Sequence, residues 1–160
     1  MKRSTFMVVA GLLSVSMLTV SCKKEEKDDT PAPTPTPTPS LYTRLGGDGA
    51  ITAVTDQFIQ NVLADPTIAD NFQATGSDPY RFALFRERLI DQLCAATGGP
   101  YTYTGANMYD AHDGMNITDA EFGALVSALV ASLNQFNVPA AEQNELLGIL
   151  GPMQTDIVGH

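Results

Sequence analysis

The residue with the most direct chemical meaning is His112. It is the one histidine inside the sequence, since the other, His160, is the last residue. A single imidazole cannot supply the several Cys and His ligands of a zinc site. It can be the one protein ligand of an iron whose four equatorial positions are filled by a porphyrin. The residue types therefore exclude a multi-ligand zinc site and permit an iron–porphyrin site in an apolar helical pocket.

The residues around His112 match a calcium-binding loop only superficially. With Gly114 at the sixth loop position, Tyr109, Ala111 and Ala120 fall at the first, third and twelfth. None of these three carries the carboxylate that calcium needs there. The sequence also has no nucleophile elbow and no phosphate-binding loop. A calcium site and a nucleophilic hydrolase are therefore both disfavoured.

The chain is acidic, with 18 Asp and Glu against nine Lys and Arg and a net charge of −9. No lysine lies beyond Lys27, and four arginines are the only strong cations of the expected fold: Arg44, Arg81, Arg86 and Arg88. Binding to nucleic acid needs a basic stripe that neutralises phosphates. We therefore expect no nucleic-acid partner and no peripheral adsorption to anionic lipid.

The N-terminus is expected to be an export signal rather than part of the fold. A short basic start precedes the apolar run from Phe6 to Val20, and Ser21-Cys22 follows directly. This ending resembles a bacterial lipobox, which implies cleavage after residue 21 and acylation of Cys22. Acyl chains would anchor the protein to a lipid bilayer of the cell envelope, on the outer membrane, facing the periplasm or the surface. The alternative is an ordinary signal peptide with an incidental cysteine.

Residues 22–40 are expected to form a linker. A charged run, KKEEKDD, is followed by the Pro-Thr repeat TPAPTPTPTPS. Proline at alternating positions blocks helix and sheet pairing, so this segment is predicted to be an extended spacer with a rise of about 3.1 Å per residue. The remaining residues 41–160 are enough for one compact domain.

That domain is predicted to be helical. Apolar residues recur at helical spacing in four segments, which are residues 51–63, 82–93, 122–136 and 146–157. Asp65-Pro66 should end the first, Asp78-Pro79 should open the second, and a capping box at Thr118 and Glu121 should open the third. Residues 98–117 are long, polar and poorly periodic, apart from a short helix near 106–111. Irregular segments of this length are usually functional. Cys94 is expected to be a buried apolar residue.

Six short segments occur in an order and at a spacing that resemble those of a known protein family. They are LYTRLGG (Leu41–Gly47), DQFIQNVLADP (Asp56–Pro66), Asn71-Phe72, ATGGPYTYTGANM (Ala96–Met108), AHDGMNIT (Ala111–Thr118) and NVPAAEQNELLGIL (Asn137–Leu150). Together they resemble a group I truncated haemoglobin, the two-over-two helical globin family, over essentially all of Leu41–Val158. The resemblance implies an all-α fold that binds haem b.

The resemblance also implies roles for individual residues. His112 matches the proximal haem ligand, which leaves the iron five-coordinate, and Met108 matches an apolar residue at the haem edge. The other positions that match haem contacts are Phe58 and Phe72, with Ile117, Phe122 and Leu129 on the proximal wall. A role purely in the core remains the alternative for each of these apolar residues. Arg86, and then Arg81, would hold the haem propionates, unless these arginines form a solvated face with partners such as Glu87 or Asp91.

The distal pocket departs from the family pattern. Many relatives carry a Tyr immediately after the Phe that matches Phe58, where this chain has Ile59. A Gln that relatives place in the distal helix corresponds to Leu89, with Phe85 one turn before it. The expected distal pocket is therefore apolar, although a shifted register could turn Gln92 inward. Without a donor, bound oxygen should be held less tightly.

The function implied by the resemblance is binding of a diatomic ligand (O2, NO or CO) at the haem iron. The family's chemistry also includes weak NO dioxygenase or peroxidase activity with an unidentified reductase, but the missing donor favours binding over catalysis. The alternative function is that of a haem-free helical interaction module on a lipoprotein stalk. A minor third possibility is capture or relay of haem at the envelope.

Overall fold

The computed structural model describes residues 37–160. The expected signal peptide at residues 1–21, the acylated Cys22 and most of the Pro-Thr linker lie outside the described residues. Within residues 37–160, no helix is both long enough and apolar enough to cross a membrane.

The described part of the chain is built from helices. In order they are α1 (Leu41–Arg44), α2 (Gly47–Ala64), η1 (Ala69–Phe72), α3 (Gln73–Gly76), α4 (Pro79–Ala96), α5 (Met108–His112), α6 (Asp119–Gln135), α7 (Ala140–Leu150) and η2 (Gly151–Asp156). The only strand-like pairing among residues 37–160 is a single bridge between Ile117 and Val158. The all-α prediction is therefore confirmed, and all four periodic segments fold as helices.

The helix boundaries follow the signals in the sequence. Asp78 caps α4 by accepting hydrogen bonds from the backbone of Tyr80 and Arg81, and Pro79 occupies the first turn, where a missing N–H costs nothing. Thr118 and Glu121 form a complete capping box at the start of α6. These polar side chains satisfy backbone donors that a helix start would otherwise leave unpaired.

The fourth predicted helix differs from the expectation in one respect. It was expected to continue to Ile157, but α7 ends at Leu150 and the chain tightens into the 3-10 helix η2. Pro152 explains the change, because it lacks the N–H that the next α-helical hydrogen bond would need.

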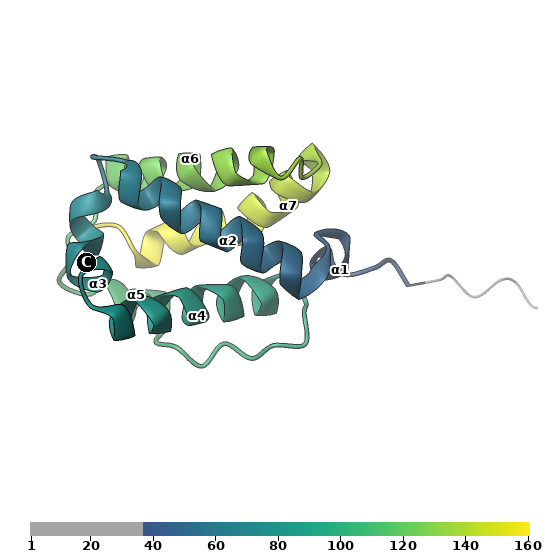
Figure 1. Ribbon diagram of the computed structural model, residues 1–160, viewed down its shortest axis with the longest axis horizontal. Coiled ribbons are helices and arrows are strands. Elements are labelled where there is room, and N and C mark those ends of the chain that lie inside the picture. Colours follow the sequence, from purple (N-terminus) through teal and green to yellow (C-terminus); the bar gives the residue numbers. More distant parts are fainter. Residues whose placement is uncertain (1–36) are drawn as a thin grey trace, which may run out of the picture. The chain divides into compact units, whose positions relative to one another are not determined.

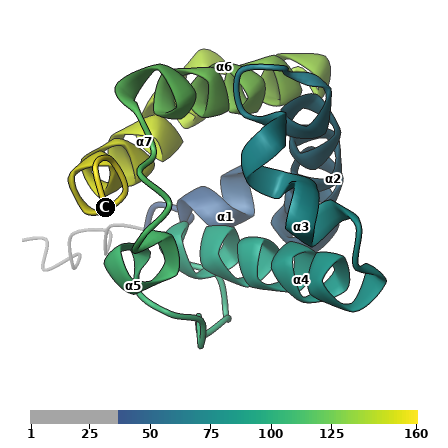
Figure 2. The same ribbon diagram turned by 90° about the vertical axis from the view of Figure 1, so that its left-hand side faces the viewer.

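The four long helices enclose the core. Helix α2 packs against both α6 and α4 and runs diagonally between them in Figure 1. The turned view of Figure 2 shows α6 above α4, with α2 and α7 on opposite sides. The short helix α5 packs against η2, and Figure 2 shows it on the same side as α7. This arrangement places the irregular segment around His112 at one edge of the helical assembly.

Buried apolar residues form two clusters. The large cluster draws on α1, α2, α4, α6 and α7, and its most deeply buried members include Val62, Cys94 and Leu133. The small cluster consists of Ile117, Phe122 and Ile157, with Met108, Val126, Met153 and Val158 packed against it. Cys94 is fully buried, as predicted, and burial raises the pKa of its thiol to about 11.

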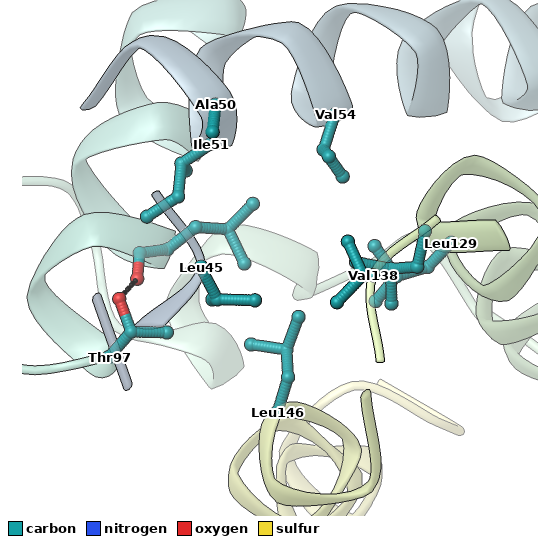
Figure 3. A pocket seen from close by; sticks show the side chains of 10 residues that line it. Leu45, Ala50, Ile51, Val54, Thr97, Leu129, Val138 and Leu146 are labelled. Carbon is teal, nitrogen blue, oxygen red and sulfur yellow. Dashed lines mark hydrogen bonds between the residues drawn. The ribbon is translucent and has the colours of Figure 1, made fainter. Parts of the chain in front are cut away.

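A small cavity of about 20 Å³ lies inside the large cluster, next to α1 (Figure 3). Its walls are almost entirely aliphatic and include Leu45, Val54, Leu129 and Leu146. The one hydroxyl in its lining, that of Thr97, donates to the Leu93 carbonyl at 2.7 Å. An apolar cavity of this kind offers a water molecule no good partner and stays dry.

Candidate functional site

Helix α5 is short and carries His112 as its last residue. Asn107 caps its first turn, accepting a hydrogen bond from the Asp110 backbone at 2.8 Å. The chain then leaves the helix through Gly114 and Asn116, both of which have positive φ angles (78° and 52°). Glycine adopts that left-handed conformation freely and asparagine tolerates it. These two residues let the chain turn sharply from His112 into α6.

The imidazole of His112 is held by its own helix. Its Nδ1 lies 2.7 Å from the main-chain carbonyl oxygen of Met108, one turn earlier. A carbonyl oxygen can only accept, so Nδ1 carries the proton and donates it to this bond. In the neutral ring, Nε2 then keeps its lone pair. A donor bond from the other ring nitrogen is what orients a metal-ligating histidine and fixes its tautomer.

The small cluster contains three of the residues predicted to line the haem. Ile117 and Phe122 are buried, and Met108 packs against them. All three lie close in sequence to His112, on α5, on α6 or between them. The structure therefore brings together an oriented imidazole and an apolar wall at one edge of the fold.

The residues expected on the opposite side of the haem lie in the large cluster. Phe58 and Ile59 are buried on α2, and Phe72, Phe85 and Leu89 pack against that cluster. The ring centroids of Phe72 and Phe85 are 5.5 Å apart, and the ring planes are tilted by 53°. This is a favourable arrangement for two aromatic side chains. These positions remain predictions as haem contacts, but the fold does gather them.

Leu129 lies in the large cluster, away from the other two residues expected on the proximal wall. It is buried and lines the small cavity. Its predicted contact with haem thus competes with a packing role that the structure shows directly.

Gln92 is half-buried, and its amide nitrogen lies 3.3 Å from Met108 Sδ and 3.6 Å from Met153 Sδ. It therefore points toward Met108 and Met153, which pack against the small cluster. The shifted register would turn Gln92 inward, and its half-buried amide does point to two sulfur atoms beside the small cluster. A role for Gln92 as a donor to a bound ligand stays a prediction. The residues expected in the distal pocket, Ile59, Phe85 and Leu89, are all apolar.

Arg86, the first candidate for a haem propionate, is engaged elsewhere. Its Nε and second terminal nitrogen donate to the two carboxylate oxygens of Asp56, at 2.5 and 2.8 Å. These hydrogen bonds raise the pKa of Arg86. The solvated-face alternative therefore fits the geometry, with Asp56 of α2 as the partner in place of Glu87 or Asp91.

Arg88 is a functional candidate that the sequence alone did not identify. It is half-buried, and its guanidinium donates to the Thr104 hydroxyl in the irregular segment before α5. It shares one face of α4 with Phe85, Leu89 and Gln92, following the helical spacing of three, four and seven. That spacing was the available signal. Arg81 is exposed, and no carboxylate of residues 37–160 pairs with it.

Comparison with known proteins identifies the family. The sequence pattern of the family described as bacterial-like globin matches residues 40–158. A group 1 truncated haemoglobin of Mycolicibacterium paratuberculosis is 35% identical over 118 residues, which cover 74% of this chain and 83% of that protein. A group 1 truncated haemoglobin of Tetrahymena pyriformis is 32% identical over 120 residues, covering 75% and 95%.

Solved structures agree with the sequence relatives. The truncated haemoglobin of Tetrahymena pyriformis in its Fe(III) form superposes with a TM-score of 0.69 at 30% identity, covering 76% of this chain and all of that one. The 2/2 haemoglobin of Synechococcus sp. PCC 7002, in the cyanomet state with covalently attached heme, gives 0.68 at 29% identity, covering 75% and 98%. These chains are matched along nearly their whole length. Residues 37–160 form one compact unit, called here the globin unit. The chain belongs to the group 1 truncated haemoglobins, within the bacterial-like globin family.

Proposed function

We propose that the protein binds haem b through His112 and leaves the other face of the iron open to a diatomic ligand. Membership of a globin family implies a haem cofactor. The observation that carries the proposal is the 2.7 Å bond from His112 Nδ1 to the Met108 carbonyl, which leaves Nε2 free to bind iron. The donor chemistry of the site therefore fits a haem with one protein ligand.

The apolar residues would hold the porphyrin by excluding water. Met108, Ile117 and Phe122 would line the His112 side. Ile59, Phe85 and Leu89 would face the opposite side, with Phe58 and Phe72 beside them. When bound, haem supplies an iron centre that takes up O2, NO or CO. The surrounding side chains set how strongly each gas is retained.

The propionates would be held by Arg88. Its present partner, the Thr104 hydroxyl, is neutral, so a carboxylate could replace or join that contact as a charge-assisted bond. Arg86 is the weaker candidate because Asp56 already satisfies its guanidinium. The residue proposed to bind the propionates is therefore Arg88, two residues after Arg86 on α4.

The apolar distal residues favour gas binding over efficient NO dioxygenation. A hydrogen-bond donor in the distal pocket would stabilise a bound O2 ligand by about 1.5–3 kcal/mol, the range for a charge-assisted bond. Losing that donor weakens oxygen retention by roughly one to two powers of ten, while neutral CO is affected less. Any weak dioxygenase or peroxidase activity would need an external reductase.

We further propose that the globin unit works at a bacterial cell envelope, tethered through acylated Cys22 and the Pro-Thr linker. The support for this lies in the sequence alone, in the apolar run that ends at Ser21-Cys22. Metabolic labelling with a radioactive fatty acid would test it, because a Cys22→Ser variant should lose the label and the wild type should carry it.

The proposal for His112 is tested by spectroscopy of the globin unit. The wild-type unit with hemin should give a haem protein spectrum, and its reduced form should bind CO. His112→Gly should lose the five-coordinate ferrous spectrum and regain it when free imidazole is added, whereas Gly148→Ala, a change in α7 with open space around the added Cβ, should keep it. A His112→Gly variant with an unaltered spectrum would refute the ligand assignment. A unit that stays colourless with hemin would favour the haem-free interaction module.

A further inference from the structure

The last residues of the chain are bonded to the connection that follows His112. The Asn116 backbone N–H donates to the His160 carbonyl at 2.5 Å, and the Gly159 N–H donates to the Ile117 carbonyl at 2.9 Å. Between them, Ile117 and Val158 form the parallel bridge. We call residues 157–160 the C-terminal clasp. The clasp pairs with the chain within five residues of the proposed iron ligand.

The clasp also contacts α5 through a side chain. The His160 ring packs against Tyr109, with ring centroids 4.5 Å apart, and its Nε2 donates to the Thr155 carbonyl at 3.2 Å. Tyr109 lies on α5, next to Met108, whose carbonyl accepts the His112 bond. Ile157 packs with Ile117 in the small cluster. Both the helix that carries His112 and the turn after it are therefore fixed from the same side.

Helix α5 depends on such outside contacts. It has only five residues, and a single helical turn of that length is not stable by itself in water. Its exit passes through Gly114 and Asn116 in left-handed conformations, which fix the direction of the chain but do not hold it down. Among the elements of residues 37–160, α5 packs chiefly against η2, which leads directly into the clasp.

We propose that the C-terminal clasp is a positioning device for His112, with Gly159 and His160 as its key residues. Resting on the proposed haem function, this assigns the clasp the task of setting the orientation of the imidazole toward the iron. A loosened clasp would let α5 tilt, so that the iron–imidazole bond becomes heterogeneous and haem escapes faster.

Gly159 offers a clean perturbation. Its φ is +82°, and a Cβ at this position would meet no atom within 4 Å, so Gly159→Ala introduces backbone strain without a clash. Gly159→Asn is the conservative partner, since asparagine tolerates this conformation better. Gly148→Ala is the matched control, because Gly148 lies in α7 and also has open space around its Cβ. His160→Ala removes the ring contact with Tyr109.

The test measures three properties of the globin unit and its variants. These are the iron–histidine stretching band of the ferrous form by resonance Raman, the rate of haem transfer to an acceptor globin, and amide exchange at Ala111 and Met115 without haem. We expect Gly159→Ala and His160→Ala to shift or broaden the band, to accelerate haem transfer by about three- to tenfold, and to speed exchange at both amides. In all three measurements, the values for Gly159→Asn should fall between those of Gly159→Ala and the wild type.

Two results would overturn the proposal. In the first, Gly159→Ala and His160→Ala give a band of the same position and width as Gly148→Ala. Their haem-transfer rates also stay within twofold of that control, even if their melting temperatures fall. The clasp would then only stabilise the fold. In the second, the wild-type unit takes up no hemin, which refutes the proposed function and the clasp proposal together. A normal wild-type spectrum with unchanged clasp variants refutes the clasp proposal alone.

Discussion

Two arginines that lie two residues apart on α4 should affect different properties when replaced by glutamine. Arg86 is bonded through two nitrogens to Asp56, whereas Arg88 has a neutral hydroxyl as its partner. Arg86→Gln removes a link between α4 and α2 and should reduce stability. Arg88→Gln removes the proposed propionate anchor and should reduce haem retention.

The magnitudes follow from exposure. The Arg86 and Asp56 side chains are 37% and 40% exposed, so their ion pair is screened by water and contributes about 0.2–1 kcal/mol in spite of its two bonds. The propionates of a bound haem would also be exposed to water. Screening would therefore reduce the ion pair between Arg88 and a propionate to a similar extent. We expect a loss of about 1 kcal/mol in binding, which corresponds to roughly fivefold faster haem release.

The assay compares the two variants in parallel. Urea unfolding of the haem-free unit gives the free energy of unfolding, and transfer of haem to an acceptor globin gives the release rate. Arg86→Gln should lower the free energy of unfolding and leave the haem release rate within twofold of wild type. Arg88→Gln should speed haem release and leave the free energy of unfolding nearly unchanged. Faster haem release in Arg86→Gln with no change in Arg88→Gln would refute this reasoning and restore the original assignment of Arg86.

Two further predictions concern titratable groups in the globin unit. With the pKa of Cys94 near 11, about one thiol in a thousand is ionised at pH 8, against about one in ten at the ordinary value of 9.0. Labelling with a thiol reagent should therefore be at least about 100-fold slower in the native than in the unfolded protein, and a native rate within tenfold of the unfolded rate would contradict the burial of Cys94. Bonds from Thr118 and Asn71 lower the pKa of Glu121, so its contribution to stability is present above its usual value of 4.5 and is lost as the pH falls below it. As the pH falls from about 5 to 3, Glu121→Gln should consequently lose less stability than wild type, as measured by urea unfolding. Equal losses in the two proteins would contradict a lowered pKa of Glu121.

The helical framework was predictable because its signals are local. The apolar spacing, the Asp78 cap and the Thr118–Glu121 capping box depend only on neighbours in sequence, and each holds in the structure. His112 was identified by elimination, as the one interior histidine. The bond from its Nδ1 to the Met108 carbonyl could not be read in advance, because it depends on the exact turn of α5.

The partners of the arginines could not be predicted from sequence. Asp56 lies 30 residues before Arg86, on another helix, and the pairing depends on how α2 crosses α4. Sequence reasoning offered only nearby carboxylates as partners. The bonds of the clasp were missed for the same reason, since the parallel pairing of Val158 with Ile117 joins residues that are distant along the chain and carry no strand pattern.

The arrangement of α4 separates stability from the chemistry of the site. One face, with Ile90, Leu93 and Cys94, is buried in the large cluster. The adjoining face presents Leu89, which is only half-buried. Changes on the second face therefore remove little buried apolar area, so they can alter ligand preference at small cost to folding. This explains how the fold tolerates apolar residues where many relatives place donors. The proposed distal side can change its polarity while the adjoining face of the same helix continues to hold the core together.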